Sequence, residues 1–465
     1  MAGLLLTAAF ASGARAQMRG VPLTSDQFNV DLVTGPIVGP NRVVSLGGAY
    51  TALGYGIDNA IITPAAYAAR TLWDTRWFEF DITVDYSPGA LRRIDFINNG
   101  RTNVANSDFL FVSLGTTLIA GNLGVGGIIR AQNYRIGDYA DFTLLLANYG
   151  MCYSFMDGQL LVGAAVRTAA LALTSLQDGG TLGTFTKSGP EVGVILGLAD
   201  RPYRVGVALR SAVEARADKA PMSELRFTPP NAVVLPAELQ LGLAYQFGDR
   251  PLNMRWINPH ERERELRNTI LLRRLRRQRE QRERELAEQT GGRVSSRHYE
   301  WLEEPRDPTF WREEGVRIAI EDAELQRVAA LAARRHEASL RALSRKYLLV
   351  SADLLFIGTT PRGIGLESFL SQVRQDSGRY PSLTFRVGAE GEPIPNRLRL
   401  RIGSYLEPSR FDRVRPRLHG TVGTDMRLFA FDMFGLVSEF DVRVTATLDI
   451  AERYSNFGVS VGIWH

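Results

Sequence analysis

The chain has 465 residues, of which 45% are hydrophobic and 23% charged, and its formal net charge at pH 7 is +5. These values suit an ordinary soluble protein, and no run of about 18 apolar residues could span a bilayer as a helix. A β-barrel gives the same profile, because half of each strand faces a polar lumen. The single cysteine, Cys152, excludes an intramolecular disulfide and a cysteine-based metal site.

Residues 1–16 are predicted to form a cleaved signal peptide. Met1 to Gly13 is mostly apolar or small, and Ala14 and Ala16 occupy the −3 and −1 positions of a signal-peptidase site. No Lys or Arg precedes the apolar stretch, so we expect the true translation start to lie upstream. The alternative is an amphipathic or disordered tail.

From residue 75 onward the dominant pattern is alternation of apolar and polar residues, which indicates half-buried strands. In 78–86 every even position is apolar and every odd position polar, and 397–402 and 440–449 also alternate. We count about fourteen such runs of roughly 9–12 residues, the length that a tilted strand needs to cross a bilayer. The expected strands are 76–87, 108–119, 122–134, 141–155, 159–174, 190–199, 202–213, 237–247, 346–357, 382–391, 397–406, 418–431, 436–449 and 456–464.

The connections between these runs alternate in length. Short turns are expected at 120–121, 156–158, 200–201, 392–395 and 432–435. Mostly longer polar connections lie between them, at 88–107, 175–189, 214–236, 358–381 and 407–417. Short periplasmic turns and longer outer loops are typical of outer-membrane barrels. The sequence therefore predicts an all-β transmembrane barrel of antiparallel strands in the outer membrane of a Gram-negative bacterium, with a soluble β-sandwich as the alternative fold.

Glycine is frequent within the apolar runs, where it would weaken a soluble sheet. In a barrel wall these glycines are expected to relieve crowding and to allow bending. The positions concerned are Gly124, Gly126, Gly127, Gly193, Gly197 and Gly206.

Residues 250–345 interrupt the strands with a segment rich in Arg and Glu. Asn258, Pro259 and Glu261 read as a helix cap, a first-position proline and a capping-box acid. A second helical stretch opens at Pro308. We expect an αα-hairpin or short coiled coil in the periplasm. It is either a solvated excursion without a partner or a docking arm for a periplasmic partner, peptidoglycan or an inner-membrane component. Glu alternates with Arg and aromatic interleaving is missing, so no nucleic acid is expected.

Residues 17–75 do not alternate like barrel strands. The block Val43-Val44-Ser45-Leu46-Gly47-Gly48-Ala49-Tyr50-Thr51-Ala52-Leu53-Gly54 is followed by Asp58-Asn59-Ala60 and by Thr63-Pro64-Ala65-Ala66. This order resembles the N-terminal hatch of the FadL-like transporters of long-chain fatty acids and hydrocarbons, and equally of the related PorV-type barrels. Thr63 and Ala66 depart from the Asn and Gly usual in that hatch. The segment 398–409 also resembles a late strand and loop of these proteins. The resemblance implies a fourteen-stranded barrel with an N-terminal plug.

Two sets of candidate site residues follow. Hatch or gating residues are expected at Gly47, Gly48, Tyr50, Asp58, Asn59 and Pro64, where glycines allow close packing and a proline fixes a turn. Charges would be costly on the lipid face, so charged strand residues should point into the lumen. These are Glu79, Asp81, Asp85, Asp353, Arg386, Arg399, Arg401, Arg427, Glu439, Asp441 and Arg443. They either form a lattice that holds wall and plug together or gate a substrate.

No catalytic motif appears in a supporting context, so the chain is not expected to be an enzyme, and no cofactor or metal site is expected. The first hypothesis is a passive transporter of hydrophobic, fatty-acid-like compounds, with apolar loop material at 232–236 and 364–370 at its entrance. The alternative is a non-transporting outer-membrane scaffold or secretion-associated barrel, whose periplasmic arm at 250–345 holds a partner.

Other expected partners are outer-membrane lipids, a hydrophobic small-molecule ligand and the barrel-assembly machinery, because 456–464 looks like its C-terminal sorting signal. The expected organisation is a signal peptide at 1–16, a hatch at 17–75, strands at 76–249, the helical insertion at 250–345 and strands at 346–465.

Overall fold

The computed structural model describes residues 21–88, 95–101, 110–136, 140–177, 179–216, 227–290, 308–433 and 437–464. The predicted signal peptide lies outside the described residues.

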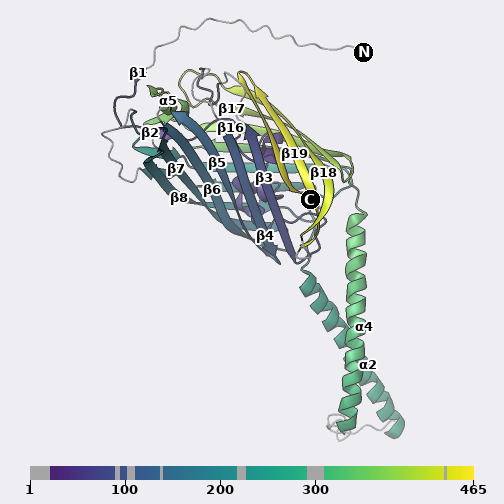
Figure 1. Ribbon diagram of the computed structural model, residues 1–465. Helices are drawn as coiled ribbons and strands as arrows, with labels where there is room; N and C mark the ends of the chain where they lie inside the picture. The colour runs from purple at the N-terminus through teal and green to yellow at the C-terminus, as the bar shows by residue number, and fades with distance from the viewer. Residues whose placement is uncertain are drawn as a thin grey trace, which may run out of the picture.

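Fourteen antiparallel strands close into a barrel (Figure 1). In order around the wall they are β3 (Phe78–Pro88), β4 (Leu110–Ala120), β5 (Leu123–Ile136), β6 (Ala140–Phe155), β7 (Leu160–Ser175), β8 (Thr181–Leu196), β9 (Tyr203–Arg210), β12 (Glu238–Phe247), β13 (Leu348–Ile357), β16 (Ser382–Ile394), β17 (Leu398–Glu407), β18 (Arg417–Met433), β19 (Val437–Ala451) and β20 (Tyr454–Ile463). The last strand pairs with the first, with Val459 opposite Tyr86. The predicted fold class is confirmed.

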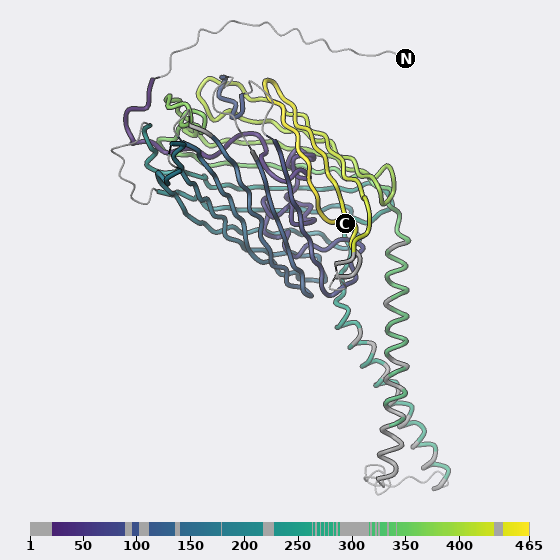
Figure 2. The backbone as a smooth tube through the Cα atoms, viewed as in Figure 1, coloured from purple at the N-terminus to yellow at the C-terminus, as the bar shows by residue number. Residues whose placement is uncertain are grey.

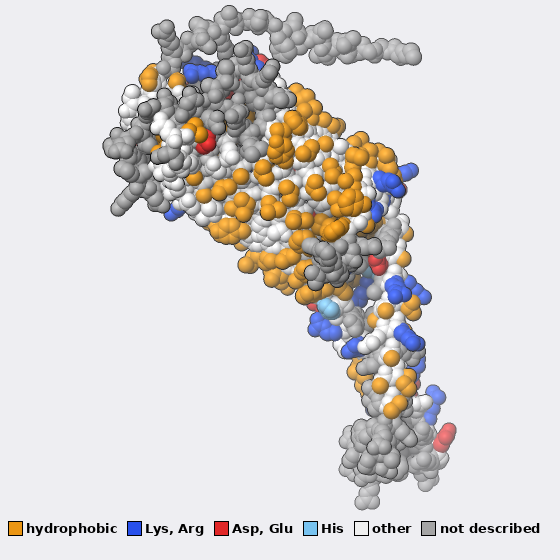
Figure 3. Space-filling model, in the orientation of Figure 1, with side chains coloured by type: hydrophobic (Ala, Val, Ile, Leu, Met, Phe, Trp, Pro, Cys, Tyr) orange, Lys and Arg blue, Asp and Glu red, His pale blue; other side chains and the backbone are white. Residues whose placement is uncertain are grey.

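Alternation along the strands separates an outward apolar face from an inward face. The outward residues of β9 are Tyr203, Val205, Val207 and Leu209, with exposed fractions from 40% to 51%. The inward residues Ala208 and Arg210 are buried. Hydrophobic side chains cover much of the barrel wall seen in Figure 3. Such a surface suits a surrounding of lipid rather than water.

The connections at one end of the barrel are short, as the sequence predicts. They are 121–122, 156–159, 197–202, 395–397 and 434–436, of which the last lies outside the described residues. At the other end the prediction is partly wrong. Strand β8 begins at Thr181, so most of the expected loop 175–189 is strand that pairs with β7. Residues 181–189 are mostly polar and do not alternate, so the pattern did not indicate a strand there. A strand that extends beyond the lipid needs no apolar face. A two-residue link, 452–453, also joins β19 to β20 at this end.

The helical insertion leaves the barrel between β12 and β13, at the end with the short turns (Figure 1). Its helices are α2 (Pro259–Thr290) and α4 (Pro308–Arg341), and at 1.5 Å per residue each is about 50 Å long. Asn258 caps α2, because its side-chain oxygen accepts from the His260 amide at 3.1 Å. Among the described residues, no helix combines the length and apolarity needed to cross a membrane.

Small elements cover the opposite end of the barrel, which is called the outer end after its predicted position. A four-stranded sheet has the order β10 (Val213–Arg216), β11 (Ala232–Leu235), β2 (Asn29–Asp31) and β14 (Gly363–Gly365). Strands β1 (Val21–Pro22) and β15 (Val373–Arg374) pair beside it, and α5 (Leu366–Leu370) follows β14. From β2 the chain runs into the barrel, where Figure 2 shows it as a purple tube inside the wall. There it forms α1 (Asn41–Ser45) and two 3-10 turns, η1 (Ile57–Ile61) and η2 (Pro64–Ala68).

Candidate functional site

Glycines on the inner wall let the hatch segment, residues 17–75, approach the strands closely. A Cβ added at Gly403 would overlap the Gly47 amide nitrogen, and one added at Gly206 would overlap the Thr51 carbonyl. The other wall glycines whose added Cβ would lie within 3 Å of a hatch atom are Gly115, Gly124, Gly163, Gly193, Gly242, Gly388, Gly423 and Gly458. Close approach to the hatch, more than bending of the wall, therefore explains glycine at these positions.

Gly47 and Gly48 are required by backbone conformation as well as by space. Their φ angles are +63° and +73°, a region that side-chain-bearing residues rarely adopt. A Cβ on Gly47 would also lie 2.8 Å from the Ser404 amide nitrogen on β17. The hatch glycines singled out from the sequence thus turn the chain directly against the wall.

One carboxylate from β13 holds the turn after these glycines. Asp353 Oδ2 accepts from the amides of Tyr50 and Thr51 at 3.0 and 2.9 Å, and from Thr51 Oγ1 at 2.5 Å. Gln240 on β12 donates to the same oxygen at 3.0 Å. Asp353 and Tyr50 are both buried, so each lost hydrogen bond would leave a polar group without water.

A buried ion-pair network joins the hatch to β17, β18 and β19. Asp58 Oδ2 accepts from Arg42 at 3.3 Å and from Arg443 on β19 at 3.0 Å. On β18, Asp425 receives both terminal nitrogens of Arg401, at 2.8 and 2.7 Å, and lies 3.5 Å from Arg42 Nε. These side chains are at most 4% exposed. The network therefore locks hatch and wall together by charge in a water-poor space.

Two further carboxylates on β3 accept from hatch amides. Asp81 accepts from Ile57 and Asp85 from Asn41, each at 2.8 Å. Three of the acids predicted to face the lumen, counting Asp353, thus hold the hatch by its backbone.

The remaining predicted residues lie in varied places. Asn59 is buried in η1, and its side-chain amide has no hydrogen-bond partner within the described part of the chain. Pro64 is buried at the start of η2. Glu79 lies near Arg70, Arg386 donates to the Gly48 carbonyl at 3.4 Å, and Arg399 lies 3.6 Å from Glu390.

Arg427 and Asp441 pair with each other at 2.7 Å near the end of the wall, where both are partly exposed. Glu439 belongs to β19, but its side chain is outside the described residues.

The predicted set lacks the hub of the network, Asp425. A signal for it was present, because Asp425 is two residues from Arg427 and so shares its face of the strand. Glu390 on β16, which accepts from Arg401 Nε at 2.6 Å, was also missed. The same alternation places it on the inner face.

At the outer end the two apolar segments expected at an entrance come together. Val233, from 232–236, and Phe369, from 364–370, belong to one buried cluster with Phe28 of the hatch. The Phe369 ring lies 5.9 to 6.4 Å from those of Phe28, Phe142 and Phe227. The two segments therefore meet in this cluster, where Val233 and Phe369 are buried.

A small polar group borders this cluster. Asn99 donates to Glu367 Oε2 at 2.6 Å, and the Asn99 amide donates to Asp95 at 2.8 Å. Burial, followed by the nearby Asp95 carboxylate, raises the pKa of Glu367 to about 8. The side chain of Arg417 also reaches this group, donating to the Asp95 carbonyl at 2.6 Å.

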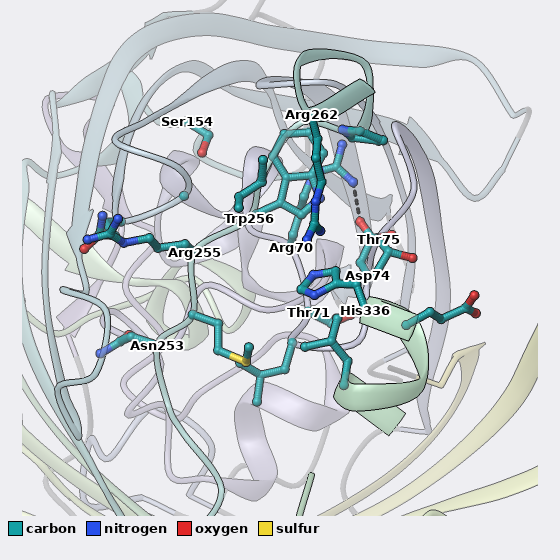
Figure 4. Close-up of a pocket in the computed structure, with 18 of the residues that line it drawn as sticks. Arg70, Thr71, Asp74, Thr75, Ser154, Asn253, Arg255, Trp256, Arg262 and His336 are labelled. Carbon is teal, nitrogen blue, oxygen red and sulfur yellow. Dashed lines mark hydrogen bonds and ion pairs between the residues drawn. The ribbon is translucent and has the colours of Figure 1, made fainter. Parts of the chain in front are cut away.

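At the end with the short turns, which is the predicted periplasmic end, the structure has a cavity of about 400 Å³ (Figure 4). The end of the hatch, the short turns, the 253–259 linker and residues 326–340 of α4 line it. Figure 4 shows Trp256 and Arg70 at its centre, and the Arg70 guanidinium carbon lies 4.1 Å from the Trp256 ring centroid. No sequence pattern pointed to this cavity, because turns, linker and helix meet only in the folded chain.

Comparison with known proteins gives matches of fold only. No protein-family model and no curated protein sequence matches the chain. Among solved structures, the Ralstonia pickettii toluene transporter TbuX matches with 12% identity and a TM-score of 0.44, over 92% of this chain and 97% of that one. The Pseudomonas putida toluene transporter TodX matches with 11% identity and 0.45, over 92% and 98%. A Pseudomonas aeruginosa FadL homologue matches with 10% identity and 0.45, over 94% and 99%.

Proposed function

We propose that the chain is an outer-membrane channel that passes small hydrophobic compounds when its hatch shifts. The observation that carries the proposal is the path of the hatch segment. It runs from the buried aromatic cluster at the outer end, through the lumen, to the cavity at the periplasmic end. A packed apolar cluster at one end and a cavity at the other, separated by a chain segment, is an arrangement suited to gated passage.

The contacts between hatch and wall indicate which interactions would have to break for the hatch to move. The described hatch is held by hydrogen bonds and ion pairs rather than by a continuous sheet with the wall. Such contacts can exchange one by one for others, whereas a strand added to the wall would have to break its whole ladder. Asp58, Asn59 and the paired glycines are the proposed gating residues.

The test is a disulfide that locks α1 of the hatch to β20. A Cβ added at Gly458 would lie 2.8 Å from Asn41 Cγ, so an Asn41→Cys, Gly458→Cys pair has suitable spacing for an S–S bond. The native Cys152 is buried and should stay out of the exchange. We expect uptake of carbon-14-labelled naphthalene by intact cells to fall at least tenfold in the oxidised variant and to return on reduction.

The reduced form of the same variant is the matched control, because it carries both substitutions with the hatch free. Equal uptake in the oxidised and reduced forms would show that passage does not need the hatch to move. Cells without the protein give the background of diffusion through lipid.

A second candidate function, a scaffold, is favoured by apolar side chains exposed on the helical arm. On α2 they are Leu271, Leu272 and Leu275, between 49% and 67% exposed, and on α4 they are Val316, Ile320, Val328 and Leu331, between 46% and 63% exposed. The α4 positions recur near helical spacing and so share one side of the helix. An uncovered apolar stripe of this kind often marks a protein contact.

Shortening the arm separates the two functions. Replacing 276–320 by a short Gly/Ser linker keeps the helix ends that border the barrel. A transporter should keep its naphthalene uptake, whereas a scaffold should show the envelope defect of a full deletion with the barrel still folded. Folding is checked by the anomalous gel mobility of the unboiled barrel.

A further inference from the structure

The cavity at the periplasmic end has a lining of two kinds. Its inner part is apolar and is formed by Ala68 and Ala69 of the hatch, with Leu161 and Ile195 of the wall. Leu340 closes it from α4 and is buried there. A cavity of about 400 Å³ falls within the size range of small-molecule sites, about 300–1,000 Å³.

The rim of the cavity carries an excess of positive charge, because five arginines line the cavity against two acids, Asp74 and Glu337. Arg70 is neutralised by an ion pair with Asp74. Arg262 of α2 and Arg334 of α4 also line the cavity, and neither has an ion pair with an acid in the part of the chain that the structure describes. Arg204 is held by Asn253 and by backbone carbonyls, so its charge also lacks an acidic partner there. The rim therefore favours an anion.

A buried donor independently indicates a ligand. The indole Nε1 of Trp256 is buried and has no hydrogen-bond partner among the described residues. A buried N–H group without an acceptor is costly, and it gains most from a ligand that brings one. Figure 4 places the indole in the middle of the cavity, with Arg262 on one side and His336 on the other.

The pKa of His336 also reflects the positive charge at this site. Partial burial, followed by the Arg262 charge, lowers the pKa of this imidazole below its usual range. An anion close to both side chains would stabilise the Arg262 guanidinium and offset the lowering of the His336 pKa by that charge.

We propose that this cavity binds a single-chain amphiphile, with its alkyl chain against the apolar inner part and its anionic head at Arg262, Arg334 and the Trp256 N–H. The roof of the site comes from α4, so the helical insertion completes a receiving site at the exit of the barrel. This inference rests on the proposed transport function for the origin of the ligand, but binding is measured separately from uptake.

The test uses the full chain in nanodiscs of zwitterionic phosphatidylcholine, with titration calorimetry of three probes. Dodecanoate carries an anionic head, dodecanol has the same chain without charge, and lysophosphatidylglycerol carries its charge as a membrane lipid does. We expect dodecanoate to bind at least tenfold more tightly than dodecanol. Arg262→Gln should remove about tenfold of that affinity, the usual contribution of one charge-assisted hydrogen bond. Ala332→Phe, which fills the cavity from α4, should abolish binding of every probe.

The matched control is Arg264→Gln, which removes the same charge from an exposed position of α2 outside the cavity. Tight binding of lysophosphatidylglycerol alone would keep the site and assign its ligand to the inner leaflet. Equal affinity for dodecanol and dodecanoate, or an Arg262→Gln affinity equal to wild type, would overturn the proposal. Arg264 lies outside the cavity, so naphthalene uptake should persist in Arg264→Gln, and its loss in that control would concern the channel instead.

Discussion

The lumen and the helical arm both pair arginines with acids, but in opposite surroundings. In the lumen, Arg401 and Asp425 are fully buried and meet through two hydrogen bonds. On the arm, Arg279 and Glu283 pair across one helical turn at 3.1 Å, with 78% and 50% of their side chains exposed. The same residue types thus have two different roles. The buried pair is costly to break, whereas water screens the exposed pair, which therefore contributes little to stability.

This contrast explains how one chain holds a plug and also extends an arm. Buried pairs tie the hatch to particular strands, because a misplaced charge would have no water to solvate it. Exposed pairs keep the arm helical and soluble without fixing what it touches. The four predictions below test this difference.

The largest effect is expected from Asp425→Asn. The substitution leaves Arg401, Arg42 and Arg443 around a neutral amide in a buried site, and removing one partner of such a pair costs about 3–5 kcal/mol. Urea unfolding in lipid, followed by the gel mobility of the unboiled barrel, measures the loss. A cost below about 1 kcal/mol would mean that water reaches these side chains.

A smaller effect, about 2–3 kcal/mol, is expected from Asp353→Asn, because the amide accepts more weakly than the carboxylate from Tyr50 and Thr51. The hatch should loosen locally while the wall stays closed. Limited proteolysis of the folded barrel should then cleave within the hatch segment, and single-channel current should rise. Unchanged protease resistance of the variant would contradict the role of this carboxylate.

The pH dependence of the outer end should follow Glu367. Its folded pKa, about 8, is above the ordinary value of 4.5, so its contribution to stability is complete below about pH 4.5 and is lost as pH rises through 8. Between pH 6 and 8 the loss amounts to about 2 kcal/mol. Thermal melting of the wild type should therefore fall over this window. Glu367→Gln should flatten the curve, and an unaltered pH profile in that variant would refute the assignment.

The smallest effect is expected on the arm. Glu283→Gln should change the free energy of unfolding by about 0.5 kcal/mol or less, because an exposed pair one turn apart contributes little. Circular dichroism of the α-helical signal during thermal unfolding is the measurement. A loss comparable to that of Asp425→Asn would show that the arm is packed rather than solvated.

Much of the fold can be predicted from the sequence, because the alternation of apolar and polar residues shows which side chains of each strand point outward and which point inward. Alternation located the strands and the inward charges Asp81, Asp85 and Asp353 without any knowledge of their partners. It failed at 181–189, where the chain needs no lipid-facing side chains, and it could not indicate that Asp425 meets Arg401 and Arg42. The cavity around Trp256 was beyond such reasoning, because its lining comes from segments that approach one another only after folding.

The wall glycines also constrain the order in which the molecule is assembled. Hatch atoms from Asn41 to Tyr67 fit closely against glycines on strands from β4 to β20. The hatch is made before every wall strand, and the ring is completed only when β20 meets β3. We therefore expect the hatch to be in place before the strands close around it, so that it templates the ring during assembly.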